Sequence, residues 1–221
     1  MEKAALVVGG TSGLGLQLAL GLVPMYKVTV TGRKDPQDSR LSFAYLDINP
    51  RESLSQKLDA VVSNSRHLDL LVYAAGFYQE GKIDILSDEE ITKMAYVGFN
   101  APVMLLQRIL KRQQSLPGFI AITSTSQWTP RLLEPVYTGV KAGLGMLASS
   151  LSLDSRIEKT LVVAPAGMAT EFWAGTGRDM TSMLDPAWVA KQILNQYPGA
   201  FAYKFVRLLR EPLRVEVGDV R

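Results

Sequence analysis

A glycine-rich turn between an apolar strand and an apolar helix constrains this chain more than any other feature. Residues 4–8 (AALVV) are apolar and rich in β-formers, and residues 9–15 (GGTSGLG) follow at once. Leucines and alanines from Leu14 to Leu22 then predict a helix. Because a wholly apolar strand suits a parallel sheet covered on both faces, the start of the chain predicts an α/β unit.

The same turn predicts a phosphate-binding site. Four glycines within seven residues exceed what a plain strand-to-helix turn needs. Glycines let the backbone turn tightly and approach a pyrophosphate, and the helix N-terminus favours the anion. The spacing differs from G-x-G-x-x-G, but strand, turn and helix stand in the order that a dinucleotide site requires. The residues expected to hold the dinucleotide here are Gly9, Thr11, Ser12, Gly13, Leu14 and Gly15.

Further apolar segments alternate with helical segments. Strands are expected at residues 28–31, 42–46, 68–73, 119–123 and 161–164, and helices at 51–65, 87–112, 135–153 and 186–196. The tail over 201–221 holds one candidate edge strand, at 214–217. This alternation predicts an α/β fold with a doubly wound parallel sheet of the Rossmann type. Without a repeat or a linker, residues 1–221 are expected to form a single domain.

Composition narrows the function classes. The chain has 221 residues, a net charge of +3 and scattered basic residues, which argues against nucleic-acid binding. It has no cysteine and one histidine, His67, so neither a thiolate nor a histidine-rich metal site is expected. No apolar run reaches membrane-spanning length, and the N-terminus does not resemble a signal peptide. A cytoplasmic protein with no membrane contact is expected.

The end of the second predicted strand indicates which dinucleotide would bind. An acidic residue at this place binds the ribose 2′-hydroxyl of NAD, whereas arginine accepts the 2′-phosphate of NADP. The strand ends at Gly32 and is followed by Arg33 and Lys34. Guanidinium–phosphate pairing therefore favours NADP over NAD. The competing interpretation is that both cations are simply solvated in a loop.

A tyrosine and a lysine one helical turn apart form a candidate proton-transfer pair. Tyr137 and Lys141 share one face of the predicted helix. A lysine cation near a phenol favours the phenolate, so we expect a lowered pKa for Tyr137. Ser124 follows a strand and is expected at the same sheet edge as the glycine turn. Asn100 lies within a predicted helix, where asparagine is unfavourable unless it faces solvent or makes a specific polar contact.

Taken together, these motifs resemble the short-chain dehydrogenase/reductase family, classical type and somewhat shortened, over roughly residues 4–195. The glycine turn looks like that family's phosphate loop, and Asp47 matches its adenine-contacting aspartate. The catalytic tetrad of the family is matched in order by Asn100, Ser124, Tyr137 and Lys141. Its remaining cofactor contacts are matched by Ala75, Gly76, Pro165 and Thr170. Departures from the family pattern occur at Val8, Tyr73, Ala74 and Ala166.

The resemblance implies hydride transfer between NADP(H) and a small-molecule carbonyl or alcohol. Tyr137 would be the general acid/base, with Lys141 also binding the nicotinamide ribose. Ser124 would hold the carbonyl oxygen, and Asn100 would anchor a water in a proton relay. A short substrate flap is expected at about 166–185, where apolar side chains, together with Trp128, suggest an apolar substrate: Phe172, Trp173, Met180 and Met183. Packing in the core is the competing interpretation for Phe172 and Trp173.

Two other functions stay open at this point. A non-catalytic dinucleotide sensor or interaction protein on the same fold would need the glycine turn but not the tetrad. Lyase or isomerase chemistry could use the same tetrad without net hydride transfer to a substrate. Occupation of all four tetrad positions favours the enzyme. The family resemblance further implies a homodimer or homotetramer.

Overall fold

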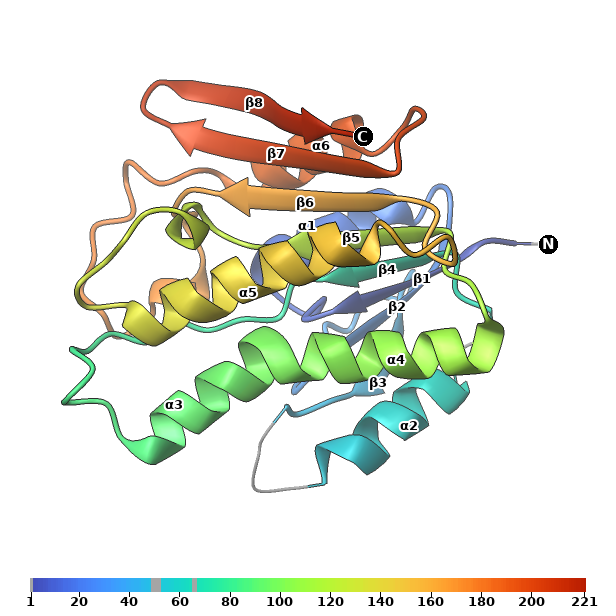
Figure 1. Ribbon diagram of the computed structural model, residues 1–221, viewed down its shortest axis with the longest axis horizontal. Helices are drawn as coiled ribbons and strands as arrows, with labels where there is room; N and C mark the ends of the chain where they lie inside the picture. The colour runs from blue at the N-terminus through green and yellow to red at the C-terminus, as the bar shows by residue number, and fades with distance from the viewer. Residues whose placement is uncertain (1, 49–52, 65–66) are drawn as a thin grey trace.

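The computed structural model describes residues 2–48, 53–64 and 67–221 as a three-layer α/β fold (Figure 1). One eight-stranded sheet of order β3-β2-β1-β4-β5-β6-β7-β8 forms the middle layer. Its strands are β1 (Ala4–Val8), β2 (Lys27–Gly32), β3 (Ser42–Tyr45), β4 (Leu70–Tyr73), β5 (Gly118–Ile122), β6 (Thr160–Pro165), β7 (Tyr203–Arg210) and β8 (Leu213–Val220). All neighbouring strands are parallel except β7 and β8.

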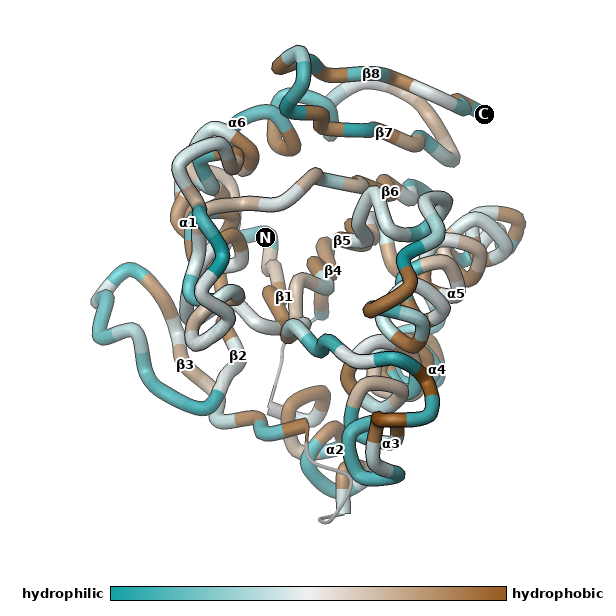
Figure 2. The backbone as a smooth tube through the Cα atoms, turned by 90° about the vertical axis from the view of Figure 1, so that its left-hand side faces the viewer, coloured by the Kyte–Doolittle hydropathy of each residue, from teal (hydrophilic) through white to brown (hydrophobic). Residues whose placement is uncertain are grey.

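Helices cover both faces of the sheet, as Figure 2 shows in an end-on view. Helices α1 (Gly13–Leu22) and α6 (Pro186–Gln196) pack on one face. Helices α2 (Leu54–Asn64), α4 (Ala101–Gln113) and α5 (Pro135–Leu151) pack on the other. Of the helix predicted over 51–65, residues 51, 52 and 65 lie outside the described residues, and the rest is helical from Leu54. The doubly wound architecture predicted from the sequence is confirmed.

Double coverage explains why the central strands are apolar throughout. Every residue of β4, β5 and β6 is buried. Leu6 and Leu71 contribute to the core on the side of α4, and Val7 and Leu70 contribute to the core on the side of α1. Full burial of one such side chain stabilises the fold by about 1.5–3 kcal/mol. The two cores therefore fix the sheet on which the site is built.

The helix predicted over 87–112 is interrupted by a π-helical turn. Ser87 caps α3 (Asp88–Ala95) in a reciprocal capping box with Glu90. The π turn η1 (Tyr96–Asn100) follows, and α4 continues from it. The buried hydroxyl of Tyr73 donates a 2.6 Å hydrogen bond to the main-chain oxygen of Val97 within this turn. The aromatic side chain at the end of β4 thereby fixes the π turn against the sheet.

The C-terminal tail differs from the sequence prediction. The candidate edge strand at 214–217 lies within β8, but the preceding residues also form a strand, β7, which was not predicted. Lys204, Arg207 and Arg210 recur at every third position of β7, so the sequence lacks the period-two alternation that would predict a strand. Arg207 of β7 forms a 3.4 Å ion pair with Glu216 of β8 across the hairpin. The tail therefore extends the parallel sheet by one strand and closes it with an antiparallel edge.

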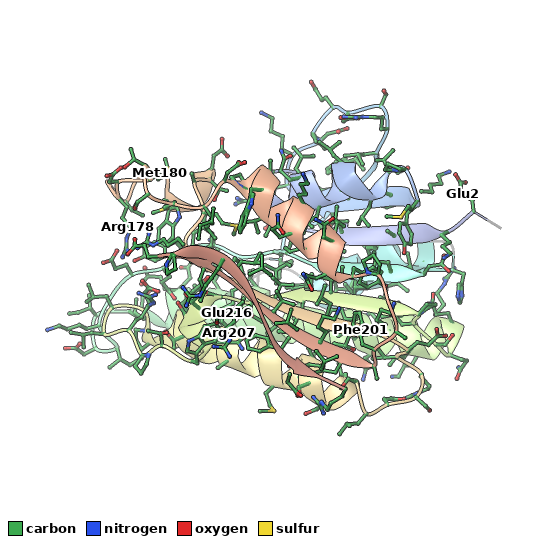
Figure 3. The ribbon with its side chains drawn as sticks, turned by 90° about the horizontal axis from the view of Figure 1, so that it is seen from above. Glu2, Arg178, Met180, Phe201, Arg207 and Glu216 are labelled. Atoms are coloured by element: carbon green, nitrogen blue, oxygen red, sulfur yellow. The ribbon has the colours of Figure 1, made fainter. Side chains whose placement is uncertain are left out.

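The parallel strands bring several loops to one edge. The loops after β1, β2, β4, β5 and β6 all leave from the carboxyl ends, where open α/β sheets bind ligands. Figure 3 shows Arg178 and Met180, from the long segment after β6, at the end of the molecule opposite Glu2. Among the residues described, none of the helices has the length and apolar character needed to cross a bilayer.

Candidate active site

A cavity of about 650 Å³ lies along this carboxyl edge. The residues expected to hold a dinucleotide line it, apart from Lys34: Gly9, Thr11, Ser12, Gly13, Leu14, Gly15, Arg33, Asp47, Ala75, Gly76, Tyr137, Lys141, Pro165 and Thr170. Lys34 is exposed and, among the described residues, is not part of the cavity lining. The fold thus brings segments from six separate parts of the chain to one cleft.

The glycine turn needs glycine for two reasons. Gly9 has φ +77°, a left-handed conformation that side chains disfavour. A Cβ at this position would lie 2.6 Å from the Cα of Ala75, so the turn packs directly on the backbone after β4. The amides of Gly9 and Gly10 both donate to the main-chain oxygen of Thr31 at 3.1 Å. These contacts hold the N-terminus of α1 at the cavity, where its dipole favours an anion.

Ser124, Tyr137 and Lys141 meet at the same cavity. Ser124 follows β5, whereas Tyr137 and Lys141 stand on successive turns of α5. Residues Tyr137 and Lys141 are 8% and 6% exposed, and both line the cavity, so the phenol is not sealed in hydrocarbon. The Lys141 ammonium donates a 3.0 Å hydrogen bond to the main-chain oxygen of Ile122 and lies 5.7 Å from the centre of the Tyr137 ring.

The electrostatics of the pair correct one expectation. The pKa of Tyr137 is raised to about 12, chiefly by burial and to a smaller extent by the Glu134 carboxylate, while Ser124 and Arg131 act in the lowering direction. The sequence predicted a lowered pKa, and that prediction is wrong for the protein by itself because desolvation of the phenolate dominates. Burial also lowers the pKa of Lys141 to about 8. The site therefore holds a phenol that keeps its proton near neutral pH.

Asn100 stands apart from this group. It is the last residue of the π turn, is partly buried, and is not among the described residues that line the cavity. Its backbone continues without a break into α4, with Pro102 near the start of that helix.

The segment over 166–185 folds across one end of the cavity. A short 3₁₀ turn, Glu171–Trp173, contains Phe172, whose ring meets the Tyr137 ring edge-on at 6.0 Å. Trp173 and Met183 also line the cavity, as expected from the sequence. The other two apolar residues expected near the substrate, Trp128 and Met180, are not among the described residues that line the cavity. Trp128 packs instead on Phe205 at 5.8 Å, and Met180 is 42% exposed.

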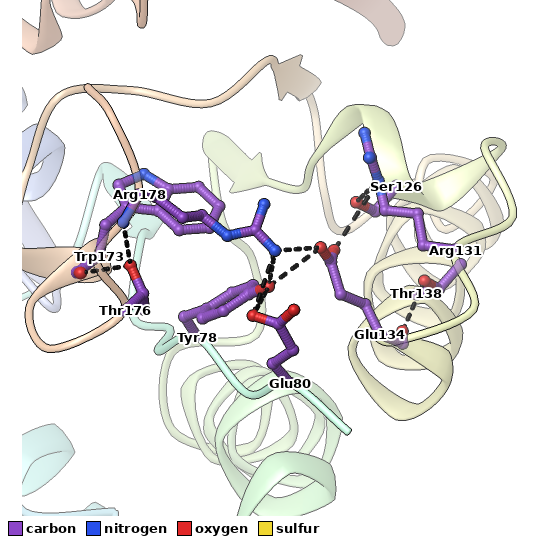
Figure 4. Close-up of polar contacts among 9 residues, drawn as sticks. All are labelled: Tyr78, Glu80, Ser126, Arg131, Glu134, Thr138, Trp173, Thr176 and Arg178. Carbon is purple, nitrogen blue, oxygen red and sulfur yellow. Dashed lines mark hydrogen bonds and ion pairs between the residues drawn. The ribbon is translucent and has the colours of Figure 1, made fainter. Parts of the chain in front are cut away.

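Sequence reasoning missed a polar cluster beside the phenol, shown in Figure 4. Its members are Tyr78, Glu80, Arg131, Glu134 and Arg178. Glu134 is 7% exposed and immediately precedes α5, three residues before Tyr137. The sequence could have predicted the role of Glu134 from this spacing, because a carboxylate about one helical turn before a candidate acid/base raises the pKa of that residue. The pairing with the distant residues 78 and 178 had no local signal.

Comparisons with known proteins identify the family of this chain. The family model described as short chain dehydrogenase matches residues 3–181. An uncharacterized oxidoreductase from Staphylococcus epidermidis is 24% identical over 99% of this chain and 96% of its own length. A 2,3-dihydro-2,3-dihydroxybenzoate dehydrogenase from Escherichia coli is 26% identical over 92% of this chain and 80% of its own length.

Solved structures share the fold. An alcohol dehydrogenase from the archaeon Thermococcus sibiricus, complexed with 5-hydroxy-NADP, aligns with a TM-score of 0.80 at 19% identity, covering 98% of this chain and 100% of that one. A short-chain dehydrogenase from Sphingobium yanoikuyae in complex with NADPH aligns with a TM-score of 0.75 at 18% identity, covering 88% and 84%. Given the family match over most of its length, this chain belongs to the short-chain dehydrogenase family and is an oxidoreductase.

Proposed function

We propose that this protein transfers a hydride between NADP(H) and a small carbonyl or alcohol, with Tyr137 as general acid/base. The observation that carries the proposal is the convergence of Ser124, Tyr137 and Lys141 on the cavity that the glycine turn also lines. A dinucleotide-binding module without chemistry would not require a buried phenol and a buried ammonium group at the same cleft, because burying both is costly.

The cavity suits a dinucleotide along its length. At the β1 end, the glycine turn and the N-terminus of α1 would hold the diphosphate, since backbone amides and the helix dipole favour anions there. Arg33 would bind the 2′-phosphate, and Asp47 would contact the adenine side. At the β6 end, Pro165 and Thr170 would position the nicotinamide, and Ala75 and Gly76 offer a flat surface between the two ends.

The nicotinamide, when bound, would supply or accept the hydride. In the direction of reduction, Tyr137 would donate its proton to the developing alkoxide oxygen. A phenol with a pKa of about 12 keeps that proton at neutral pH, which is the state that reduction requires. The Ser124 hydroxyl would hold the same oxygen. Lys141 would bind the nicotinamide ribose and, while charged, stabilise the phenolate that remains.

Two further roles belong to the proposal, those of Asn100 and of the segment over 166–185. Asn100 would act at a distance from the cavity, through a water held at the π turn, and this role is supported by the family resemblance alone. The segment over 166–185 would act as the substrate flap, supported by the position of Phe172 against Tyr137 and by Trp173 and Met183 in the lining. These side chains favour a substrate with an apolar body.

The test is a binding titration followed by an activity survey. Purified protein should bind NADPH with enhanced nicotinamide fluorescence and bind NADH more weakly. It should then oxidise NADPH in the presence of at least one compound from a panel of ketones, quinones and aldehydes. Binding of NADPH without turnover across the panel would favour a sensor, whereas no binding of either dinucleotide would reject the proposed function.

A further inference from the structure

Arg178 contacts groups from two separate loops, although its side chain stays 36% exposed. Its guanidinium carbon lies 4.8 Å from the Tyr78 ring centre and 5.0 Å from the Trp173 ring centre, so the cation is placed against two aromatic faces. It also donates a hydrogen bond to the Tyr78 hydroxyl (Figure 4). Tyr78 follows β4, whereas Trp173 and Arg178 belong to the segment after β6. The contact therefore joins two loops that are about a hundred residues apart.

Two carboxylates also contact Arg178. The Arg178 guanidinium donates to Glu80 at 3.2 Å and forms a 3.7 Å ion pair with Glu134. The Glu134 side chain is only 8% exposed, and a buried carboxylate without a cation is strongly unfavourable. Arg131, also 3.7 Å from this carboxylate, comes from the loop just before α5. Arg178 thus brings a compensating charge from across the cleft to the residue that precedes the Tyr137 helix.

A chain of aromatic contacts connects Arg178 with Tyr137. Tyr78 and Trp173 lie 4.6 Å apart, Trp173 and Phe172 lie 5.1 Å apart, and Phe172 meets Tyr137 at 6.0 Å. Edge-on and tilted pairs of this kind have preferred geometries and resist displacement. A shift of the outer loop at Arg178 would therefore be transmitted to the ring that packs against the proposed acid/base.

The base of the same segment is fixed separately. Ala169 donates to the oxygen of Leu184, and Leu184 donates to the oxygen of Gly167, both at 2.9 Å. The indole N–H of Trp173 donates to the oxygen of Met168 at 2.9 Å. The segment is thus a loop closed at its base, and Arg178 ties its outer part to the opposite side of the cleft.

We propose that Arg178 is a positioning residue for the reaction inferred above: its contacts with Tyr78, Glu80 and Glu134 hold the 166–185 segment closed and so place Phe172 against Tyr137. The proposal rests on the proposed function, because it states how the same site is held in its working geometry. Arg178 also lines the cavity, but the contacts described above join it to residues of the two outer loops, and it reaches Tyr137 only through Trp173 and Phe172.

The structural half of the proposal is tested without turnover. Trp173 would be the single indole in a Trp128→Phe, Trp188→Phe background, and its fluorescence would report the contact with Arg178. Arg178→Met should shift the Trp173 emission to longer wavelength and increase its quenching by iodide by about twofold or more, as expected for a loop that opens to water. Arg156→Met is the matched control, because Arg156 also pairs with a carboxylate, that of Asp154, but at an exposed site remote from the cleft. Unchanged emission and quenching in Arg178→Met would overturn the proposal.

The functional half of the proposal is tested by measuring kcat and KM separately. Arg178→Met should lower kcat per NADPH-binding site by about tenfold and raise the KM for the carbonyl, because small losses of alignment slow reactions by factors of this size. The affinity for NADPH and the number of binding sites should stay unchanged. A merely structural loss would instead lower the number of sites and leave kcat per site and KM as they were, and would contradict the proposal. Arg178→Lys, which keeps the charge, should restore part of the activity.

A double substitution tests whether Arg178 acts through Phe172. Phe172→Leu should reproduce the kinetic effect of Arg178→Met, and the double variant should be no more than about twofold worse than the poorer single variant. If the fold-losses in kcat of the two single variants multiply in the double variant, the two residues act independently, and Arg178 does not act through Phe172. If the wild type proves inactive with every carbonyl, the proposed function fails, whereas the Trp173 measurement still decides whether the closing contact exists.

Discussion

The ammonium group of Lys141 is held by the main-chain oxygen of Ile122, to which it donates a hydrogen bond over 3.0 Å. The bond ties the middle of α5 to the end of β5 and fixes where the buried cation lies relative to the Tyr137 ring. A carbonyl dipole compensates a full charge only in part, so this arrangement costs stability. The lowered pKa of Lys141, about 8, expresses that cost.

We therefore predict that Lys141→Met stabilises the protein while abolishing turnover. At pH 7 the wild type must bury a charged lysine, so the substitution should raise the free energy of unfolding by about 1–3 kcal/mol. Urea denaturation of both proteins without cofactor measures this difference.

The pH dependence of this difference has a definite sign. The folded-state pKa of Lys141, about 8, is below its ordinary value of 10.5, so between these values the unfolded chain binds a proton that the folded protein has released. Wild-type stability should therefore rise with pH through this window relative to the variant, and the gap should narrow. A variant that is less stable than the wild type at pH 7, or a gap that widens above pH 8, would contradict the assignment.

Arg33 should determine the preference for NADP. Arg33→Ala should weaken NADPH binding by about ten- to a hundredfold, because a charge-assisted contact contributes about 1.5–3 kcal/mol, and should leave NADH binding within about twofold. Lys34→Ala is the control, since Lys34 is exposed and is not among the described lining residues. Fluorescence titrations at one fixed ionic strength compare the three proteins. If Lys34→Ala weakens NADPH binding more than Arg33→Ala does, Lys34 and not Arg33 binds the 2′-phosphate, and the prediction is wrong.

Two glycines should respond to alanine in opposite directions. Gly9→Ala forces a side chain into a left-handed conformation and against the backbone of Ala75, so it should destabilise the fold by at least about 2 kcal/mol and impair NADPH binding. Gly139 lies within α5, and among described atoms no neighbour is within 4 Å of an added Cβ. Gly139→Ala should therefore stabilise the helix by up to about 1 kcal/mol. Chemical denaturation measures the free energy of unfolding of both variants. If Gly9→Ala and Gly139→Ala change it equally, the turn at Gly9 is not strained as described.

Much of the fold was readable because local patterns and tertiary packing agree. The apolar runs at 4–8 and 119–123 became buried parallel strands, and Ser87 began a helix with its capping box. The strand β7 was not readable, because its charged residues recur at every third position and Arg207 meets a carboxylate only when β8 folds back against it. The π turn at Tyr96–Asn100 was likewise hidden, since the hydroxyl that fixes it comes from Tyr73, distant in sequence.

The site was predictable where its residues follow strands or share a helix turn. Ser124, Tyr137 and Lys141 belong to this class, and the structure brings them to one cavity. The direction in which the Tyr137 pKa shifts was not predictable, because it depends on how completely the chain buries the phenol. The Arg178 contacts depend on loop closure across the cleft and have no counterpart in local sequence. The roles of these residues and the oligomeric state remain predictions.

The most direct test of the account is the activity of Tyr137→Phe. Removing the phenolic hydroxyl removes the proposed proton donor but keeps the ring that packs on Phe172. Turnover with NADPH and the best carbonyl substrate should fall by about a hundredfold to ten-thousandfold, the range expected for loss of a general acid. NADPH affinity should stay within about threefold, and Tyr203→Phe, at the opposite edge of the sheet, should match the wild type. A Tyr137→Phe protein that keeps a substantial part of the wild-type kcat would contradict the central claim.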